Sequence, residues 1–251
     1  MPRRRLEDRI ALITGASRGI GAAVAARFAA EGAHLILVAR TEGGLEEVDD
    51  RVRAAGGSAT LVPLDLLDGE AIDRLGASVA ERWGRLDVLV ANAAMLGRLA
   101  PLGHVPPAEW DQVVALNLTA NWRLGRAFDP LLRASEAGRV IFVTSGITQR
   151  AVAYWGAYAV TKAALEALAK TYAAEVAKSN VRVNLVNPGP TRTRMRAQAF
   201  PGEDPESLKP PEAVTEAFVA LAEPAFTGNG LWIAADEPPP PAPPSPPGRV
   251  H

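Results

Sequence analysis

Short apolar runs alternate with longer helical stretches along most of the chain. The apolar runs predict strands at residues 10–13, 35–38, 59–62, 88–90, 140–143, 181–186 and 231–233. The stretches between them predict helices at 20–30, 42–55, 70–83, 155–178 and 211–222, with one long helix inside 107–133. Strands that are apolar throughout are typical of a parallel sheet that helices cover on both faces. The pattern therefore predicts an α/β fold.

The length of the chain and its last residues define the expected domain organisation. The 251 residues suit one α/β domain, which we place at residues 1–236. Residues 238–247 are almost all proline, which lacks the backbone donor of a sheet ladder. We therefore predict that residues 237–251 form an extended or disordered polyproline-like tail, with a docking role as the alternative.

The composition excludes several classes of protein. Hydrophobic residues make up 48% of the chain, and the net charge of -1 shows no basic excess that would point to nucleic acid. There is no cysteine, so disulfides, thiolate metal sites and cysteine nucleophiles are excluded. No segment approaches the ~20 apolar residues that span a membrane, and Glu7, Asp8 and Arg9 interrupt a leader-like stretch. We expect a cytoplasmic protein with neither membrane nor nucleic-acid partners.

A glycine-rich turn lies between the first predicted strand and the first predicted helix. Its sequence is Thr14-Gly15-Ala16-Ser17-Arg18-Gly19-Ile20-Gly21. Gly15 permits a tight turn, and Gly19 and Gly21 let the backbone approach a pyrophosphate group and pack the helix on the sheet. Free N–H groups at the helix N-terminus face the anion. Because a strand precedes this turn and a helix follows it, the pattern predicts a dinucleotide site.

The end of the second strand selects between the two nicotinamide dinucleotides. An acidic residue there would accept hydrogen bonds from the ribose of NAD(H) and repel the 2′-phosphate of NADP(H). The chain has Arg40 instead, and Arg18 lies on the other side of the expected phosphate. Glu42 would weaken their attraction for it. We favour NADP(H), with NAD(H) as the alternative.

Tyr158 and Lys162 form a candidate reaction centre. They are four residues apart in a predicted helix, so the phenol and the ammonium group share one helix face. Ser145 lies just beyond the fifth strand, at the sheet edge where ligands bind. This combination is suited to acid–base chemistry.

These features resemble the short-chain dehydrogenase/reductase family from residue 10 to about residue 236. Thr-Gly-x-x-x-Gly-x-Gly is the family's form of the glycine turn, and Ser145 stands thirteen residues before Tyr158, as in the family. The segment 195–205 further resembles the bacterial YciK-type oxidoreductases. The resemblance implies a single Rossmann-like domain, a doubly wound parallel sheet of about seven strands, and an enzyme that acts on CH–OH groups.

The resemblance also assigns residues to the site. It implies a catalytic set of Asn117, Ser145, Tyr158 and Lys162. It implies cofactor contacts at Gly15, Ser17, Arg18, Gly19, Ile20, Gly21, Arg40, Asp65, Leu66, Asn92, Ala93, Tyr158, Lys162, Pro188, Gly189, Thr191 and Thr193. Ala94 stands where the family usually has glycine, so its φ is expected to be negative. His34 and His104 are interpreted as structural or solvated, and no metal site is expected.

The implied mechanism is hydride transfer between the nicotinamide and a carbonyl or alcohol carbon. Tyr158 would be the general acid or base, and the positive charge of Lys162 would favour its phenolate form. By resemblance, Lys162 also binds the nicotinamide ribose. Ser145 would hydrogen-bond the substrate oxygen, and Asn117 would hold a water that passes protons to Lys162.

The substrate pocket is predicted near residues 194–211. Its candidate apolar walls, which are equally compatible with ordinary core, are Met95, Leu96, Trp155 and Phe200. Arg192, Arg194 and Arg196 either attract an anionic substrate or, as we favour, serve at the surface or a subunit contact. The substrate itself is not identified.

Two alternatives to a general carbonyl or alcohol oxidoreductase stay open. A 3-oxoacyl-carrier-protein reductase would have the same fold and the same catalytic set. A non-catalytic NADP-binding regulator would be expected to have lost members of that set. In either case we expect a homodimer or homotetramer, because related enzymes pair the long helices predicted here within 107–133 and 155–178.

Overall fold

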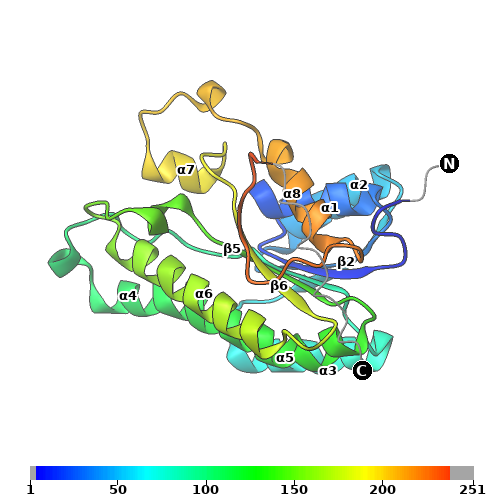
Figure 1. Ribbon diagram of the computed structural model, residues 1–251. Coiled ribbons are helices and arrows are strands. Elements are labelled where there is room, and N and C mark those ends of the chain that lie inside the picture. Colours follow the sequence, from blue (N-terminus) through cyan, green and yellow to red (C-terminus); the bar gives the residue numbers. More distant parts are fainter. Residues whose placement is uncertain (1–3, 238–251) are drawn as a thin grey trace.

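The computed structural model describes residues 4–237 of the chain (Figure 1). The proline run at residues 238–247 lies outside the described residues, so its polyproline-like conformation stays a prediction. Among the described residues, no helix is long and apolar enough to cross a membrane.

Seven parallel strands form one sheet with the order β3-β2-β1-β4-β5-β6-β7. The strands are β1 (Ile10–Thr14), β2 (His34–Ala39), β3 (Ser58–Pro63), β4 (Val88–Ala91), β5 (Arg139–Val143), β6 (Arg182–Asn187) and β7 (Trp232–Ala234). Strand order reverses between β1 and β4, and crevices at such points hold ligands in doubly wound sheets. The predicted fold class is therefore confirmed.

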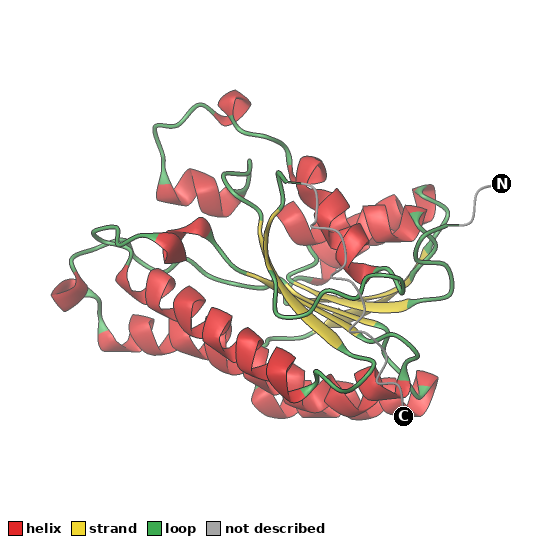
Figure 2. Ribbon diagram, in the orientation of Figure 1, coloured by secondary structure: helices red, strands yellow, loops and turns green. Residues whose placement is uncertain are grey.

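Helices cover both faces of this sheet, and loops join the strand ends to them (Figure 2). On one face lie α1 (Gly19–Ala30), α2 (Glu42–Ala54) and α8 (Thr215–Ala222). On the other face lie α3 (Gly69–Trp83), α4 (Pro107–Val114), α5 (Ala120–Ala134) and α6 (Gly156–Glu175). Short 3₁₀ turns are η1 (Leu102–His104), η3 (Gly146–Gln149), η4 (Pro205–Ser207) and η5 (Pro211–Val214).

The alternation of side chains along each strand divides the core into two layers. Ile13 of β1 and Leu37 of β2 pack with Phe28 of α1. Their neighbours Leu12 and Ile36 point to the other face and join the layer under α3, α5 and α6. Because every residue of β1 is buried, an uninterrupted apolar run was sufficient to predict it.

Two helical features differ from the prediction. The long helix expected inside 107–133 contains a π-helical segment, η2 (Ala115–Thr119), between α4 and α5. A further helix, α7 (Arg194–Ala199), forms where the sequence predicted no element. Figure 1 shows α7 standing above the carboxyl ends of the strands, apart from the two main helical layers.

Candidate active site

A cavity of about 1480 Å³ opens at the carboxyl ends of the parallel strands. It begins beside Arg40, after β2, and continues to Tyr158 and Lys162 on α6. All the sequence-predicted site residues line it except Gly21 and Asn117, which lie behind its surface. A cavity of this volume, which reaches from the glycine turn to the phenol of Tyr158, fits a dinucleotide.

Close packing explains the glycines of the turn before α1. Gly15 and Gly19 have φ values of 64° and 55°, which side chains rarely tolerate. A Cβ atom on Gly21 would stand 2.3 Å from the carbonyl oxygen of Gly15. No side chain caps the N-terminus of α1, so its first backbone N–H groups stay available for an anion.

Asn92, directly after β4, joins the glycine turn to the end of β4 through hydrogen bonds. Its Nδ2 donates hydrogen bonds to the carbonyl oxygens of Thr14 at 2.9 Å and Gly15 at 3.3 Å. The hydroxyl oxygen of Thr14 accepts from the backbone N–H groups of Asn92 and Ala93. Ala94 is not among the described non-glycine residues with positive φ, as its side chain requires.

The end of the cavity beside β2 carries two exposed arginines. Neither Arg18 nor Arg40 forms an ion pair with a described residue, so Glu42 does not neutralise Arg40 by direct contact. Asp65, after β3, uses Oδ1 to accept a hydrogen bond from the N–H of Leu67 at 3.0 Å. Two free guanidinium groups make this end of the cavity suited to a phosphate.

Ser145, Tyr158 and Lys162 meet at the other end. Tyr158 and Lys162 are 8% and 2% exposed, and they project from consecutive turns of α6. Nζ of Lys162 lies 5.7 Å from the centre of the Tyr158 ring and donates a 2.7 Å hydrogen bond to the carbonyl oxygen of Val143, the last residue of β5. The Ser145 side chain, two residues later, faces Tyr158 closely enough to lower the pKa of its phenol. The three groups predicted from sequence spacing therefore share one pocket.

The ionisation of Tyr158 differs from the expectation that Lys162 favours its phenolate. Burial raises the pKa of Tyr158 to about 12, and the nearby Ser145 hydroxyl only partly opposes this. Burial also lowers the pKa of Lys162 to about 8. Desolvation penalises the charged form of each group, so burial is the main cause of both shifts. Tyr158 is consequently a neutral proton donor here.

Asn117 lies in the π-helical segment and is fully buried. Its Oδ1 accepts from the N–H of Met95 at 2.9 Å, and its Nδ2 donates to the carbonyl oxygen of Met95 at 2.8 Å and to Thr161 at 3.2 Å. The amide thus joins the segment after β4 to the helix that carries Tyr158. A π-helical turn often marks a functional site. The role of Asn117 in holding a water stays a prediction.

The sequence did not reveal the role of Glu166, a buried acid one turn beyond Lys162 on α6. Its Oε1 accepts hydrogen bonds from Thr144 and Thr148, each at 2.7 Å, and from Nε1 of Trp232 at 2.9 Å. The two threonines flank Ser145. The spacing of Tyr158, Lys162 and Glu166 on one helix face was the signal that could have found this residue.

The loop after β6 closes the cavity on the side of the predicted nicotinamide. Oδ1 of Asn187 accepts from the N–H groups of Gly146 and Gly189, at 3.0 and 3.1 Å, so it ties this loop to the one that carries Ser145. The Thr191 hydroxyl donates within its own turn. Oγ1 of Thr193 accepts from the N–H of Arg196 at 3.2 Å and caps α7. Thr193 also faces the glycine turn, because a Cβ on Gly19 would lie 3.5 Å from its methyl group.

Aromatic side chains form one wall near Tyr158. The ring of Trp155 lies 5.9 Å from the ring of Tyr158 and 5.8 Å from that of Phe200. The guanidinium of Arg196 stacks on Phe200 at 3.8 Å and pairs with Glu203 at 2.6 Å. All four apolar candidates for the pocket, Met95, Leu96, Trp155 and Phe200, line the cavity. Phe200 brings the loop of α7 against the reaction centre.

Among residues 4–237, no three or more His, Cys, Asp or Glu side chains gather where they could hold a metal ion. The ring nitrogens of His34 lie 2.9 Å from the hydroxyl of Ser58 and 3.2 Å from that of Thr60. Its ring also packs on Trp83. His34 is thus a structural residue, as expected.

Comparison with known proteins decides the family. A family model described as short chain dehydrogenase matches residues 9–204. The chain belongs to the short-chain dehydrogenase family. This confirms the resemblance seen in the sequence and makes the chain an oxidoreductase of CH–OH groups.

Individual relatives agree with this. The oxidoreductase YciK of Escherichia coli K12 is 39% identical over 219 residues, which cover 86% of each chain. A Pseudomonas syringae protein of known structure has a TM-score of 0.90 and 40% identity, with 93% of this chain and 96% of that chain covered. A protein from Escherichia coli CFT073, complexed with NADPH, has a TM-score of 0.89 and 36% identity, covering 94% and 100%. The predicted similarity to the YciK-type subgroup is confirmed.

Proposed function

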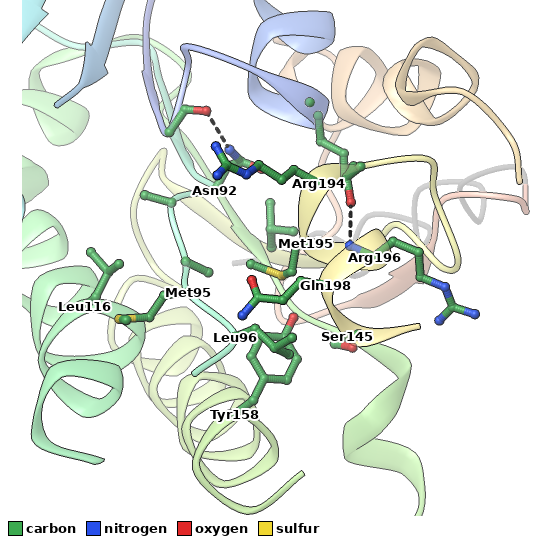
Figure 3. A pocket seen from close by; sticks show the side chains of 18 of the residues that line it. Asn92, Met95, Leu96, Leu116, Ser145, Tyr158, Arg194, Met195, Arg196 and Gln198 are labelled. Carbon is green, nitrogen blue, oxygen red and sulfur yellow. Dashed lines mark hydrogen bonds between the residues drawn. The ribbon is translucent and has the colours of Figure 1, made fainter. Parts of the chain in front are cut away.

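We propose that this short-chain dehydrogenase is an NADP(H)-dependent oxidoreductase that interconverts a carbonyl compound and an alcohol, with Tyr158 as general acid and base. One observation carries the proposal. Ser145, Tyr158 and Lys162 line the same cavity as the glycine turn before α1. Figure 3 shows Ser145 and Tyr158 in this pocket. A bound dinucleotide can therefore extend from that turn to the proton donor.

The chemistry follows from the charge that develops on the substrate oxygen. When bound, the nicotinamide would supply the hydride in reduction and accept it in oxidation. During reduction, the neutral phenol of Tyr158 donates its proton to the oxygen as the carbonyl carbon is reduced. Ser145 donates a hydrogen bond to the same oxygen. In the opposite direction, Tyr158 accepts the proton of the alcohol.

Lys162 would hold the cofactor ribose and adjust the acidity of Tyr158. Its ammonium group has one hydrogen bond within the described structure, to Val143, and therefore has donors to spare. Its pKa of about 8 leaves it mostly protonated at neutral pH. Asn117 would support the reaction in two ways. It stabilises the helix that carries Tyr158, and it would hold the predicted water that passes protons to Lys162.

The preference for NADP(H) rests on Arg18 and Arg40. Both line the cavity, both are exposed, and the position after β2 carries no acid. The similar Escherichia coli CFT073 protein was complexed with NADPH, which supports the same choice here. Replacing Arg40 by Ser should weaken NADPH binding and leave NADH binding nearly unchanged, because only NADPH has the 2′-phosphate. An equal loss of affinity for NADPH and NADH would contradict this assignment.

The experiment that tests the function is turnover of a carbonyl panel. Acyl thioesters, diketones, aldehydes and keto sugars would be mixed with NADPH, and oxidation followed by the loss of nicotinamide absorbance. Turnover should vanish in Tyr158→Phe. Tyr154→Phe is a matched control, because Tyr154 is 59% exposed and does not line the cavity. Equal turnover in wild type and Tyr158→Phe would refute the role of Tyr158.

The panel also distinguishes the alternatives. Selective turnover of acyl thioesters would favour a 3-oxoacyl-carrier-protein reductase. NADPH binding without any turnover would favour a regulator, although the presence of Asn117, Ser145, Tyr158 and Lys162 supports an enzyme.

We further propose a homodimer or homotetramer that pairs α5 and α6, where Trp122 and Val160 are exposed apolar residues. Light scattering of the purified protein would test the assembly.

A further inference from the structure

Three arginines stand at alternate positions where the loop after β6 enters α7, and their partners differ. Arg192 pairs with Glu206 at 2.5 Å, and Arg196 pairs with Glu203 at 2.6 Å. Within residues 4–237, no carboxylate lies in ion-pair distance of Arg194. Like Arg192 and Arg196, Arg194 lines the cavity, and its side chain is exposed. Its charge is therefore available to a ligand.

The direction of the Arg194 side chain indicates which part of the cavity it serves. Figure 3 shows it extended across the pocket toward Asn92, away from Ser145 and Tyr158. Asn92 is bonded directly to the backbone of Gly15 in the glycine turn. The guanidinium thus reaches the glycine-turn side of the cavity, whereas a substrate carbonyl has to approach the phenol.

The backbone fixes the starting point of this side chain. Arg194 follows Thr193, whose Oγ1 caps α7. The Thr193 methyl group lies against the turn, 3.5 Å from the position of a Cβ on Gly19. The base of the Arg194 side chain is accordingly held next to the first residue of α1. From this position, the planar guanidinium of Arg194 can pair with an anion that is bound at the glycine turn.

We propose that Arg194 clamps the pyrophosphate of the bound dinucleotide from the side opposite the glycine turn. The inference rests on the proposed dinucleotide-dependent function and adds a residue to its binding site. The backbone N–H groups at the start of α1 contact the phosphates from one side. The guanidinium of Arg194 pairs with phosphate oxygens from the other side through its two-pronged geometry. Arg18 and Arg40 are left to the 2′-phosphate.

The test compares how tightly the purified protein binds NADPH and NADH. Dissociation constants would be measured by titration calorimetry, without substrate, for wild type, Arg194→Met and Arg194→Lys. Because both dinucleotides contain the pyrophosphate, Arg194→Met should raise both dissociation constants by the same factor, about tenfold. Arg194→Lys should recover part of the loss, since a lysine keeps the charge but not the fork.

Arg192→Met is the matched control, because it removes an equal charge from the same loop. Its dissociation constants should stay near those of wild type, since Glu206 already occupies the Arg192 side chain. Circular dichroism would establish that each variant is folded.

The possible results separate the two proposals. If wild type binds neither dinucleotide, the proposed function itself fails. If wild type binds both and Arg194→Met binds them equally well, only the clamp is overturned. A loss confined to NADPH would mean that Arg194 contacts the 2′-phosphate, which also overturns the clamp. Equal losses in Arg192→Met and Arg194→Met would show a general effect of charge and would equally overturn it.

Discussion

Oε1 of Glu166 lies 2.7 Å from the hydroxyl oxygen of Thr144, the residue immediately before Ser145. The same oxygen accepts from Thr148, three residues after Ser145, and from Trp232 of β7. One carboxylate oxygen therefore joins the helix of Tyr158, the loop of Ser145 and the last strand. Because Ser145 has to stay close to the phenol, the position of Glu166 controls the geometry of the reaction centre.

We expect Glu166→Leu to leave Thr144 and Trp232 without their acceptor, whereas the Thr148 hydroxyl keeps the carbonyl oxygen of Ser145 at 3.0 Å. Each buried, unpaired donor costs roughly 1 kcal/mol or more, so the free energy of unfolding should fall by about 2–3 kcal/mol. The turnover number should fall about tenfold, because Ser145 is less well positioned. Urea denaturation and steady-state kinetics would measure the two effects.

Glu166→Gln is the control for that variant. All three donors use the same oxygen, and a glutamine amide keeps an oxygen that can occupy its place. Stability should stay within about 1 kcal/mol of wild type. If glutamine is as harmful as leucine, the charge of Glu166 matters rather than its acceptor oxygen, and the positioning argument is wrong.

Much of this site could be predicted from the sequence because its parts are local. The glycine turn is one continuous segment, and Tyr158 and Lys162 are one helical turn apart. The contact between Glu166 and Trp232 could not be predicted, because 66 residues separate them along the chain. The six-residue helix α7 was missed for a different reason. It is too short for an apolar periodicity, and its Thr193 cap is recognisable only once the helix is seen.

Lys162→Met should abolish turnover and yet stabilise the protein at neutral pH. The pKa of Lys162 falls from 10.5 to about 8 on folding, so below pH 8 the native state carries a buried charge at a cost. This shift corresponds to a penalty on the order of 3 kcal/mol, which methionine avoids. The lost hydrogen bond to Val143 reduces the gain.

The pH dependence of this effect follows from the sign of the shift. Between pH 8 and about 10.5 the unfolded chain holds more protons on Lys162 than the native protein does, so the penalty decreases as pH rises. The stability of wild type should therefore approach that of Lys162→Met across this range. Urea denaturation at several pH values would measure the difference. A constant difference would show that Lys162 is not the titrating group.

Tyr158→Phe should reduce the turnover number by more than about 100-fold, because the general acid is lost. The ring remains, so its contact with Trp155 is retained. NADPH affinity should change by less than about threefold, since the phenol contributes at most one hydrogen bond to the cofactor. Stopped-flow kinetics would measure turnover, and calorimetry would measure binding. A large loss of NADPH affinity would mean that the hydroxyl serves binding rather than proton transfer.

Phe200→Ala should change substrate selection rather than proton transfer. The Phe200 ring closes the apolar wall against Trp155 at 5.8 Å and supports the guanidinium of Arg196. Removing it opens the pocket beside the phenol, so KM for carbonyl compounds with a bulky apolar group should rise about five- to tenfold. The turnover number at saturation should change little, because Tyr158 keeps its partners. Leu102→Ala, which changes an exposed residue of η1 outside the cavity, is the control. If KM is unchanged while the turnover number falls, Phe200 acts on the position of Tyr158, and the assignment of this wall to substrate binding is wrong.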